Sequence, residues 1–273
     1  MRRSTAFMQV ILSLTFSLLF LSFQSMAGIE DTVRIVVMGT VHNSSDNFAP
    51  GKLVAIIDRI RPDLILVELD SSFFMPDMSF KPETVNLSLE NKAVSTWVKD
   101  HPVPVRPYEI EGRNRIYEEH DYFSLQKELS ASLNKAVKDS LLVPEAKSLL
   151  DAVKRFDEIA YAVSIARPEV FNSEACDKAM ELKQYYGGEG LARIVALTPS
   201  LTKFSEFCRF KHDFWITRNN TMVDHIIPWI KVFHPKTVLV ICGFEHRYYL
   251  RNGLREKSLK EAILLKEYWA YYD

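Results

Sequence analysis

Apolar residues in the first part of the chain follow two patterns. Continuous apolar runs begin at Val33, Leu64 and Val103, which is typical of parallel strands buried on both faces. Between these runs, residues 52–60 and 87–98 carry apolar side chains at steps of three and four, which predicts helices. The order strand, helix, strand, helix, strand predicts an α/β fold with a mostly parallel sheet and helices on both faces.

From about 117 to 210 the apolar residues recur at helical steps throughout, which predicts a helical cap inserted into the sheet-forming part. The sheet pattern returns with a helix over 215–233, a strand from Thr237 and a helix that begins near His246. Pro228 lies inside the first of these helices and predicts a kink or a break there.

The last apolar run, LLKEYWAYY, favours a final strand toward its tail. Residues 28–273 are therefore expected to form a single α/β domain that the helical cap interrupts. The composition agrees, because 47% apolar and 25% charged residues are typical of a compact globular protein. The 34 basic and 35 acidic residues are spread along the chain, so no basic field exists to attract nucleic acid, and no such partner is expected.

The first 27 residues have the composition of a secretory leader. Arg2 and Arg3 precede an almost uncharged apolar run over 6–23, and Ala27 closes a group of small residues that a signal peptidase reads. We expect residues 1–27 to be a cleaved signal peptide and the product to be exported, either periplasmic or secreted. An uncleaved membrane anchor is the alternative, because the apolar run approaches the length of a transmembrane helix.

Three cysteines are too few for a disulfide framework in an exported chain of this length. Cys242 ends an apolar run and is expected to be a buried thiol, whereas Cys176 and Cys208 lie in the helical middle region and could pair. None has a C-x-x-C neighbour or a local histidine, so no nucleophilic or zinc-thiolate role is expected.

Two of the predicted strands end in the same motif, Gly-x-x-His, with Gly39 before His42 and Gly243 before His246. Glycine at the end of a buried strand permits a sharp turn. That turn would hold each histidine over the carboxyl edge of the sheet, where ligands bind in open parallel sheets. The two histidines would therefore meet if their strands are neighbours.

Two further charged residues belong to the same picture. Glu68 stands at the mouth of the second apolar strand, where a metal ion or an arginine would have to offset the loss of water around its carboxylate, unless the side chain is exposed. Arg218 opens the polar segment RNNTM where a core-facing helix should be apolar. A solvated helix start with Thr221 as its cap is the alternative interpretation of that segment.

The motifs G-T-x-H, P-D-L-I-L-V-E-L, R-N-x-x-M and G-x-x-H, in this order, resemble the TraB/GumN/PrgY family. That family includes the TIKI metalloproteases and has distant relatives among erythromycin esterases and haem-binding ChaN-like lipoproteins. The resemblance covers about 33–113 and 215–253. The sequence EIEGRN after the third strand departs from the family pattern, so no role is carried over to Glu111 or Arg113.

By position, the resemblance implies that His42 and His246 are the two histidines of the family, Glu68 its acid and Arg218 its arginine. Two imidazoles and a carboxylate would leave open positions on a metal for water and substrate. Zinc, manganese and cobalt all suit such ligands, and the TIKI resemblance favours manganese or cobalt. The ion would supply hydroxide for attack on a peptide carbonyl, while Arg218 would hold a substrate carboxylate or stabilise the oxyanion.

The resemblance thus predicts a metal-dependent peptidase of the cell envelope that acts on a peptide or a small ester or amide. A metal-independent esterase is an alternative, in which one histidine takes a proton from water and Glu68 orients it. A protein that binds haem or iron without catalysis is another. Sequons at Asn43 and Asn219 abut the expected site, where a glycan would obstruct it. This favours a bacterial envelope location.

Overall fold

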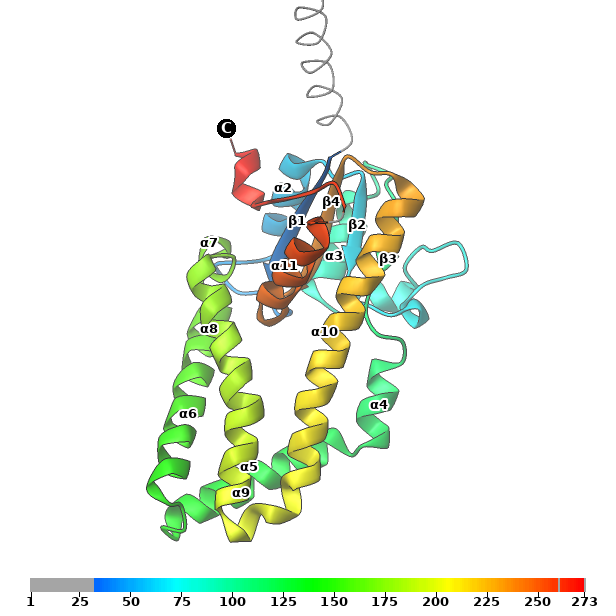
Figure 1. The fold of residues 1–273 in the computed structure, drawn as a ribbon. Helices are drawn as coiled ribbons and strands as arrows, with labels where there is room; N and C mark the ends of the chain where they lie inside the picture. Colours follow the sequence, from blue (N-terminus) through cyan, green and yellow to red (C-terminus); the bar gives the residue numbers. More distant parts are fainter. Residues whose placement is uncertain (1–31, 260, 273) are drawn as a thin grey trace, which may run out of the picture.

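The computed structural model describes residues 32–259 and 261–272. Within these residues, the centre of the fold is one all-parallel sheet of five strands in the order β3-β2-β4-β1-β5 (Figure 1). The expected α/β fold is therefore confirmed. The strands are β1 (Val33–Thr40), β2 (Leu64–Val67), β3 (Val105–Pro107), β4 (Thr237–Gly243) and β5 (Ile263–Lys266).

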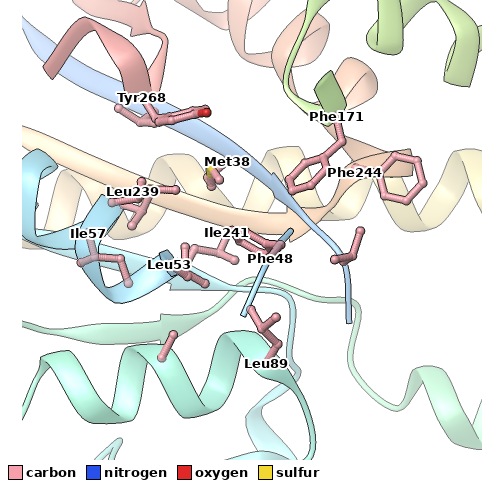
Figure 2. Packing of buried hydrophobic residues seen from close by; sticks show 14 of the residues in the cluster. Met38, Phe48, Leu53, Ile57, Leu89, Phe171, Leu239, Ile241, Phe244 and Tyr268 are labelled. Carbon is pink, nitrogen blue, oxygen red and sulfur yellow. The ribbon is translucent and has the colours of Figure 1, made fainter. Parts of the chain in front are cut away.

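Helices cover both faces of the sheet, and each strand alternates its side chains between two apolar layers. On one face, α2 (Pro50–Ile60) and α3 (Leu89–Trp97) pack against the layer that Figure 2 shows, which includes Met38, Leu239 and Ile241. On the other face lie α10 (Ser205–Phe233) and α11 (Phe244–Ser258). Because β1, β2 and β4 are buried on both faces, their sequences are continuously apolar rather than alternating.

The segment between β3 and β4 is a helical cap with a small core of its own, which includes Leu129, Leu150 and Ile194. Figure 1 shows α10 running from the far end of this cap to the sheet, so one long helix belongs to both parts. The other cap helices are α4 (Arg113–Glu119), α5 (Tyr122–Lys138), α6 (Pro144–Ser164), α7 (Pro168–Phe171), α8 (Glu174–Tyr185) and α9 (Leu191–Leu197), with a π-helical turn at Tyr186–Gly190. Short 3-10 turns occupy Ser71–Phe73, Pro82–Asn86, Pro199–Phe204 and Tyr268–Tyr271.

Two local predictions need correction. The break predicted at Pro228 is wrong, because α10 continues from Ser205 to Phe233, whereas the kink stays a prediction. Pro228 lies on the exposed side of the helix, as does Asp224 four residues earlier, so water can satisfy the carbonyl that the proline leaves without a donor. The final strand precedes the tail of the last apolar run, because β5 pairs with β1 over Val33 to Val36 and the tail forms a 3-10 turn at Tyr268–Tyr271. Tyr268 of that tail is 2% exposed.

Neither glycine of the repeated motif is explained by a left-handed backbone, and at Gly39 the reason is close packing. Gly243 has φ −55° and ψ 137°, and among the glycines in the described part of the chain only Gly112 has a positive φ. A Cβ on Gly39 would lie 3.0 Å from Cδ of Arg247 and 3.2 Å from the backbone of Phe244. Glycine is required at position 39 because a buried helix passes so close to the strand.

The side chain of Asn172, just after α7, is hydrogen-bonded to both backbone groups of Gly39. Its Oδ1 accepts the N–H of Gly39 at 2.7 Å, and its Nδ2 donates to the carbonyl of Gly39 at 3.0 Å. β5 pairs with β1 only as far as Val36. The amide therefore takes the place of a neighbouring strand at the far end of β1, and it ties the cap to the sheet.

Cys176, Cys208 and Cys242 are all buried free thiols, so Cys176 and Cys208 do not pair. They belong to separate apolar clusters, one against the sheet and one inside the cap. No helix within 32–259 and 261–272 combines the length and the apolar character that crossing a membrane requires. The predicted leader, residues 1–27, lies outside the described residues.

Candidate functional site

The residues expected from the sequence come from adjacent strands at the carboxyl edge of the sheet. β1 pairs with β4 in parallel, and Thr40 is opposite Gly243 at the end of the ladder. His42 follows β1, and His246 lies in the first turn of α11 directly after β4. Glu68 follows β2, which is the other neighbour of β4. The two strands with Gly-x-x-His are neighbours, which is the condition under which their histidines were expected to meet.

Arg218 reaches this edge from α10 and lies between the other groups. Its Nη2 donates to Oε1 of Glu68 at 2.6 Å, and its Nη1 lies 3.1 Å from Nε2 of His246. Its Nε donates to the carboxylate of Glu109, which follows β3, at 2.9 and 3.0 Å. Arg218 is 6% exposed and Glu109 is 2% exposed. Burial alone would lower the pKa of Arg218, but Glu68 and Glu109 outweigh it and raise that pKa.

His246 is held as a neutral imidazole. Burial, followed by the nearby cation of Arg218, lowers its pKa well below the usual value. Its Nδ1 lies 2.8 Å from Oδ1 of Asn219, whose Nδ2 donates to the carbonyl of Trp215. The proton is therefore assigned to Nδ1, and the lone pair of Nε2 accepts from Arg218. The indole of Trp215 stacks on the imidazole with ring centres 4.3 Å apart.

His42 forms the other half of the site, together with a carboxylate that sequence reasoning missed. Its Nδ1 lies 3.1 Å from Oε1 of Glu90, in the first turn of α3. Glu90 is buried, and Oε1 also accepts the hydroxyl of Thr40 at 2.7 Å. The hydrogen bond to Glu90 raises the pKa of His42. Burial would raise the pKa of Glu90, but the bond to His42 and the hydroxyl of Thr40 lower it.

His42 and Glu68 face the same backbone atom. Glu68 accepts the N–H of Gly243 through Oε2 at 2.7 Å. A Cβ on Gly243 would lie 3.5 Å from Nε2 of His42 and 3.7 Å from Oε2 of Glu68. The bare Cα of Gly243 thus keeps a small open space between an imidazole and a carboxylate.

Cavities open on both sides of His42. One of about 360 Å³ is lined by His42, Glu68, Glu90 and Arg113 and has an apolar wall that includes Phe73. The other, of about 440 Å³, is lined by His42, His246, Trp215 and Glu245. The side chain of His42 is 66% exposed, whereas that of Glu90 is 8% exposed. His42 is therefore the group of this site that a substrate can reach from solvent.

The expected metal ligands, His42, Glu68 and His246, are not arranged around a common point that suits an ion. The described residues contain no group of three or more His, Cys, Asp or Glu side chains placed to hold a metal. The guanidinium of Arg218 supplies the positive charge beside Glu68 and takes the lone pair of His246. The arrangement does not fit a divalent ion on these ligands unless Arg218 moves away. Manganese, cobalt or zinc at this site stays a prediction.

Glu109 could have been found by the same reasoning as Glu68, because it too follows an apolar strand-like run. Glu90 has no comparable signal, since it lies on a predicted helix among other polar residues. No family model, curated protein or solved structure matches the chain. The resemblance to the TraB/GumN/PrgY family therefore rests on the four motifs alone.

Proposed function

We propose that the protein is a hydrolase of esters or amides in which His42 activates a water molecule without a metal ion. The observation that carries this proposal is the pair of His42 and Glu90 at the junction of two cavities. A buried carboxylate that accepts the Nδ1–H fixes the tautomer, so Nε2 keeps its lone pair and serves as a base. Its raised pKa makes His42 a stronger base than a free imidazole.

The space beside Gly243 suits the reacting water. A water there would have Nε2 of His42 on one side and Oε2 of Glu68 on the other. His42 would take one proton while the oxygen forms a bond to the carbonyl carbon of the substrate. When the bond from that carbon to the leaving group breaks, His42 would return the proton to the alcohol or amine. The carbonyl product is a carboxylic acid, and the imidazole is restored.

Arg218 has a positioning role in this proposal rather than contact with substrate. Among the described residues, its Nε, both N–H groups of Nη2 and one N–H of Nη1 already have acceptors. It is 6% exposed. Its guanidinium is ion-paired with Glu68 and holds that side chain in place, and its charge helps to keep His246 neutral. The expectation that it binds a substrate carboxylate is less well supported than this role.

Activity before and after metal removal tests the proposal. The purified protein is assayed on a panel of 4-nitrophenyl esters, anilides and peptides, with His42→Ala and, as a matched control, replacement by alanine of His120, which is exposed at the end of α4. Hydrolysis that survives chelation and is lost only in His42→Ala supports the proposal. Activity that needs added manganese, cobalt or zinc would favour the metal-dependent peptidase.

Two other results would contradict the proposal. A folded protein that cleaves no member of the panel is one. A Soret band after haem titration, without hydrolysis, is the other, and it would favour the haem-binding alternative. The envelope location belongs to the same proposal, and fractionation of a bacterial host with N-terminal sequencing of the product tests it. A periplasmic protein that begins near Gly28 is expected.

A further inference from the structure

The cap contains a cavity of about 240 Å³ that the proposed reaction does not use. One wall is aromatic and includes Tyr117, Tyr122, Phe214 and Trp215. The rest of the lining consists of the π-helical turn and of charged side chains of α6, α8, α10 and α11. Aromatic walls with a few charged groups are typical of small-molecule sites.

Lys211 is the charged group of this cavity that lacks a direct partner. In the part of the chain that the structure describes, its ammonium has neither a hydrogen bond nor an ion pair with another residue, although the side chain is partly buried and lines the cavity. The neighbouring carboxylates are ion-paired with Lys183 instead. Its Nζ lies 2.8 Å from Oε2 of Glu245 and 3.8 Å from Oδ1 of Asp157. A partly buried ammonium without a protein acceptor keeps only part of its hydration, so a carboxylate from a ligand would supply the acceptor that the described residues do not.

The π-helical turn contributes Gly187 and Gly188 to the lining of the same cavity as Lys211. Residues Tyr186–Gly190 form a π-helical turn. Such turns are rare in proteins, and those that occur are often found at functional sites. A Cβ on Gly188 would lie 2.4 Å from Nδ1 of His212, whereas a Cβ on Gly187 would meet nothing within 4 Å. Glycine at 188 therefore lets α10 approach the turn closely, whereas position 187 faces open space.

The cap cavity adjoins the proposed catalytic site. Trp215 and Glu245 line both this cavity and the one that contains His42 and His246. Lys211, Trp215 and Arg218 follow one another on α10 at steps of four and three, so they lie on one face of the helix. Seven residues of helix span about 10 Å, which sets the distance along α10 between Lys211 and the buried charges of the site.

We propose that the cap cavity binds a carboxylate at the far end of the substrate, with Lys211 as its ion-pair partner and the aromatic wall against the chain that joins it to the scissile bond. This inference rests on the proposed function. One free ammonium suits a carboxylate, because a phosphate dianion would need a second cation and Lys183 is already neutralised by Glu245 and Asp157. The substrate class is therefore an ester or amide with a carboxylate several atoms from the reacting carbonyl.

A pair of substrates that differ only in this charge tests the inference by kinetics. Mono-4-nitrophenyl esters of dicarboxylic acids of increasing length are compared with the same compounds carrying a methyl ester at the far end. The wild-type protein is expected to have a higher kcat/KM for the free acids, most clearly for the longer members. Lys211→Met should lower the ratio of acid to methyl ester by roughly 10-fold to 100-fold, the range for a charge-assisted hydrogen bond.

Two variants control this comparison. Lys211→Arg keeps the charge and should keep most of the preference for the free acid. Lys154→Met makes the same substitution at an exposed lysine of α6 and should leave the ratio at the wild-type value. Thermal unfolding checks the fold, and Lys211→Met should be at least as stable as the wild type, because methionine retains the stem and removes the unpaired charge.

A binding measurement separates this inference from the proposed function. Calorimetry measures the Kd of 4-phenylbutyrate, and of the uncharged 4-phenylbutanol, for His42→Ala with and without Lys211→Met. The cap site is supported if the double variant binds 4-phenylbutyrate more weakly while its affinity for 4-phenylbutanol is unchanged. This result would count even if no ester is ever hydrolysed. Ester hydrolysis without preference for the free acid, together with binding that is indifferent to Lys211, would overturn it.

Discussion

Nδ1 of His42 lies 3.1 Å from Oε1 of Glu90, and a partly exposed imidazole is thus joined to a buried carboxylate from a different element. The hydroxyl of Thr40 lies within hydrogen-bond distance of the same oxygen and helps to fix the position of the Glu90 carboxylate. A base that is fixed in this way approaches water in one orientation and one tautomer. Each part of this arrangement can be removed without touching the reacting nitrogen.

Glu90→Gln should lower kcat for ester hydrolysis by roughly 100-fold or more, the scale of general acid–base catalysis. The amide has nearly the same shape as the carboxylate, but it does not stabilise the imidazolium that forms when His42 takes a proton. Steady-state kinetics on the best ester measures the effect. Glu83→Gln, at an exposed position in the turn before α3, is the control. Unchanged kcat in Glu90→Gln would remove Glu90 from the mechanism.

The pH dependence of kcat/KM should report the pKa of His42. The hydrogen bond to Glu90 raises that pKa above 6.5, and a base works only when deprotonated. Activity should therefore be highest above the raised pKa and fall as the pH drops through it. In Glu90→Gln the point of inflection should move to lower pH, since the cause of the shift is gone. An inflection in the same place for both proteins would assign the titration to another group.

Arg218→Met should destabilise the protein by about 3–5 kcal/mol, because it removes the cation that Glu68 and Glu109 share and leaves Glu109 only its longer contact with Arg113. The free energy of unfolding in urea measures the effect. Arg193→Met removes an arginine whose side chain is 55% exposed and ion-paired with Glu145, and a much smaller change is expected there because water screens exposed pairs. If both substitutions change the free energy of unfolding equally, Arg218 contributes no more to stability than an arginine in a surface ion pair.

The two motif glycines should respond differently to the same substitution. Gly39→Ala should destabilise the fold by about 1–3 kcal/mol, because its Cβ would press on Arg247 and on the backbone of Phe244. Gly243→Ala meets only ordinary contacts, yet its methyl group would stand between His42 and Glu68. It should therefore lower kcat/KM far more than it lowers stability. Thermal unfolding and ester kinetics on both variants test this, and the reverse order of effects would contradict it.

The three thiols should be unreactive in the native protein. Burial raises the pKa of Cys176 to about 12 and that of Cys208 to about 11, and it raises that of Cys242 well above the usual value. Ellman's reagent should label all of them in denaturant and label them only slowly without it. Fast labelling of one thiol in the native state would show that its surroundings open readily.

The sequence predicts the central strands, because burial on both faces is the property that determines their residues. The strands that carry His42, Glu68 and His246 are buried on both faces, so their apolar runs define them, and parallel order then brings their ends together. Partners such as Glu90 were not predictable, because their role depends on which helix face meets which loop. Pro228 shows the same limit, since its effect on α10 depends on exposure to water, which local sequence does not reveal.

The contact between Asn172 and Gly39 covers part of the edge of the sheet. Beyond Val36, no strand within 32–259 and 261–272 pairs with the side of β1 that faces away from β4, and an open strand edge is a template on which another chain can pair and aggregate. The amide of Asn172 occupies both backbone groups of Gly39 on that edge. A single side chain from the cap thus blocks hydrogen bonding of another chain to this part of the strand edge. If the cap detached, we expect the backbone groups of that edge to become available for intermolecular strand pairing at the same edge of the sheet that carries the catalytic residues.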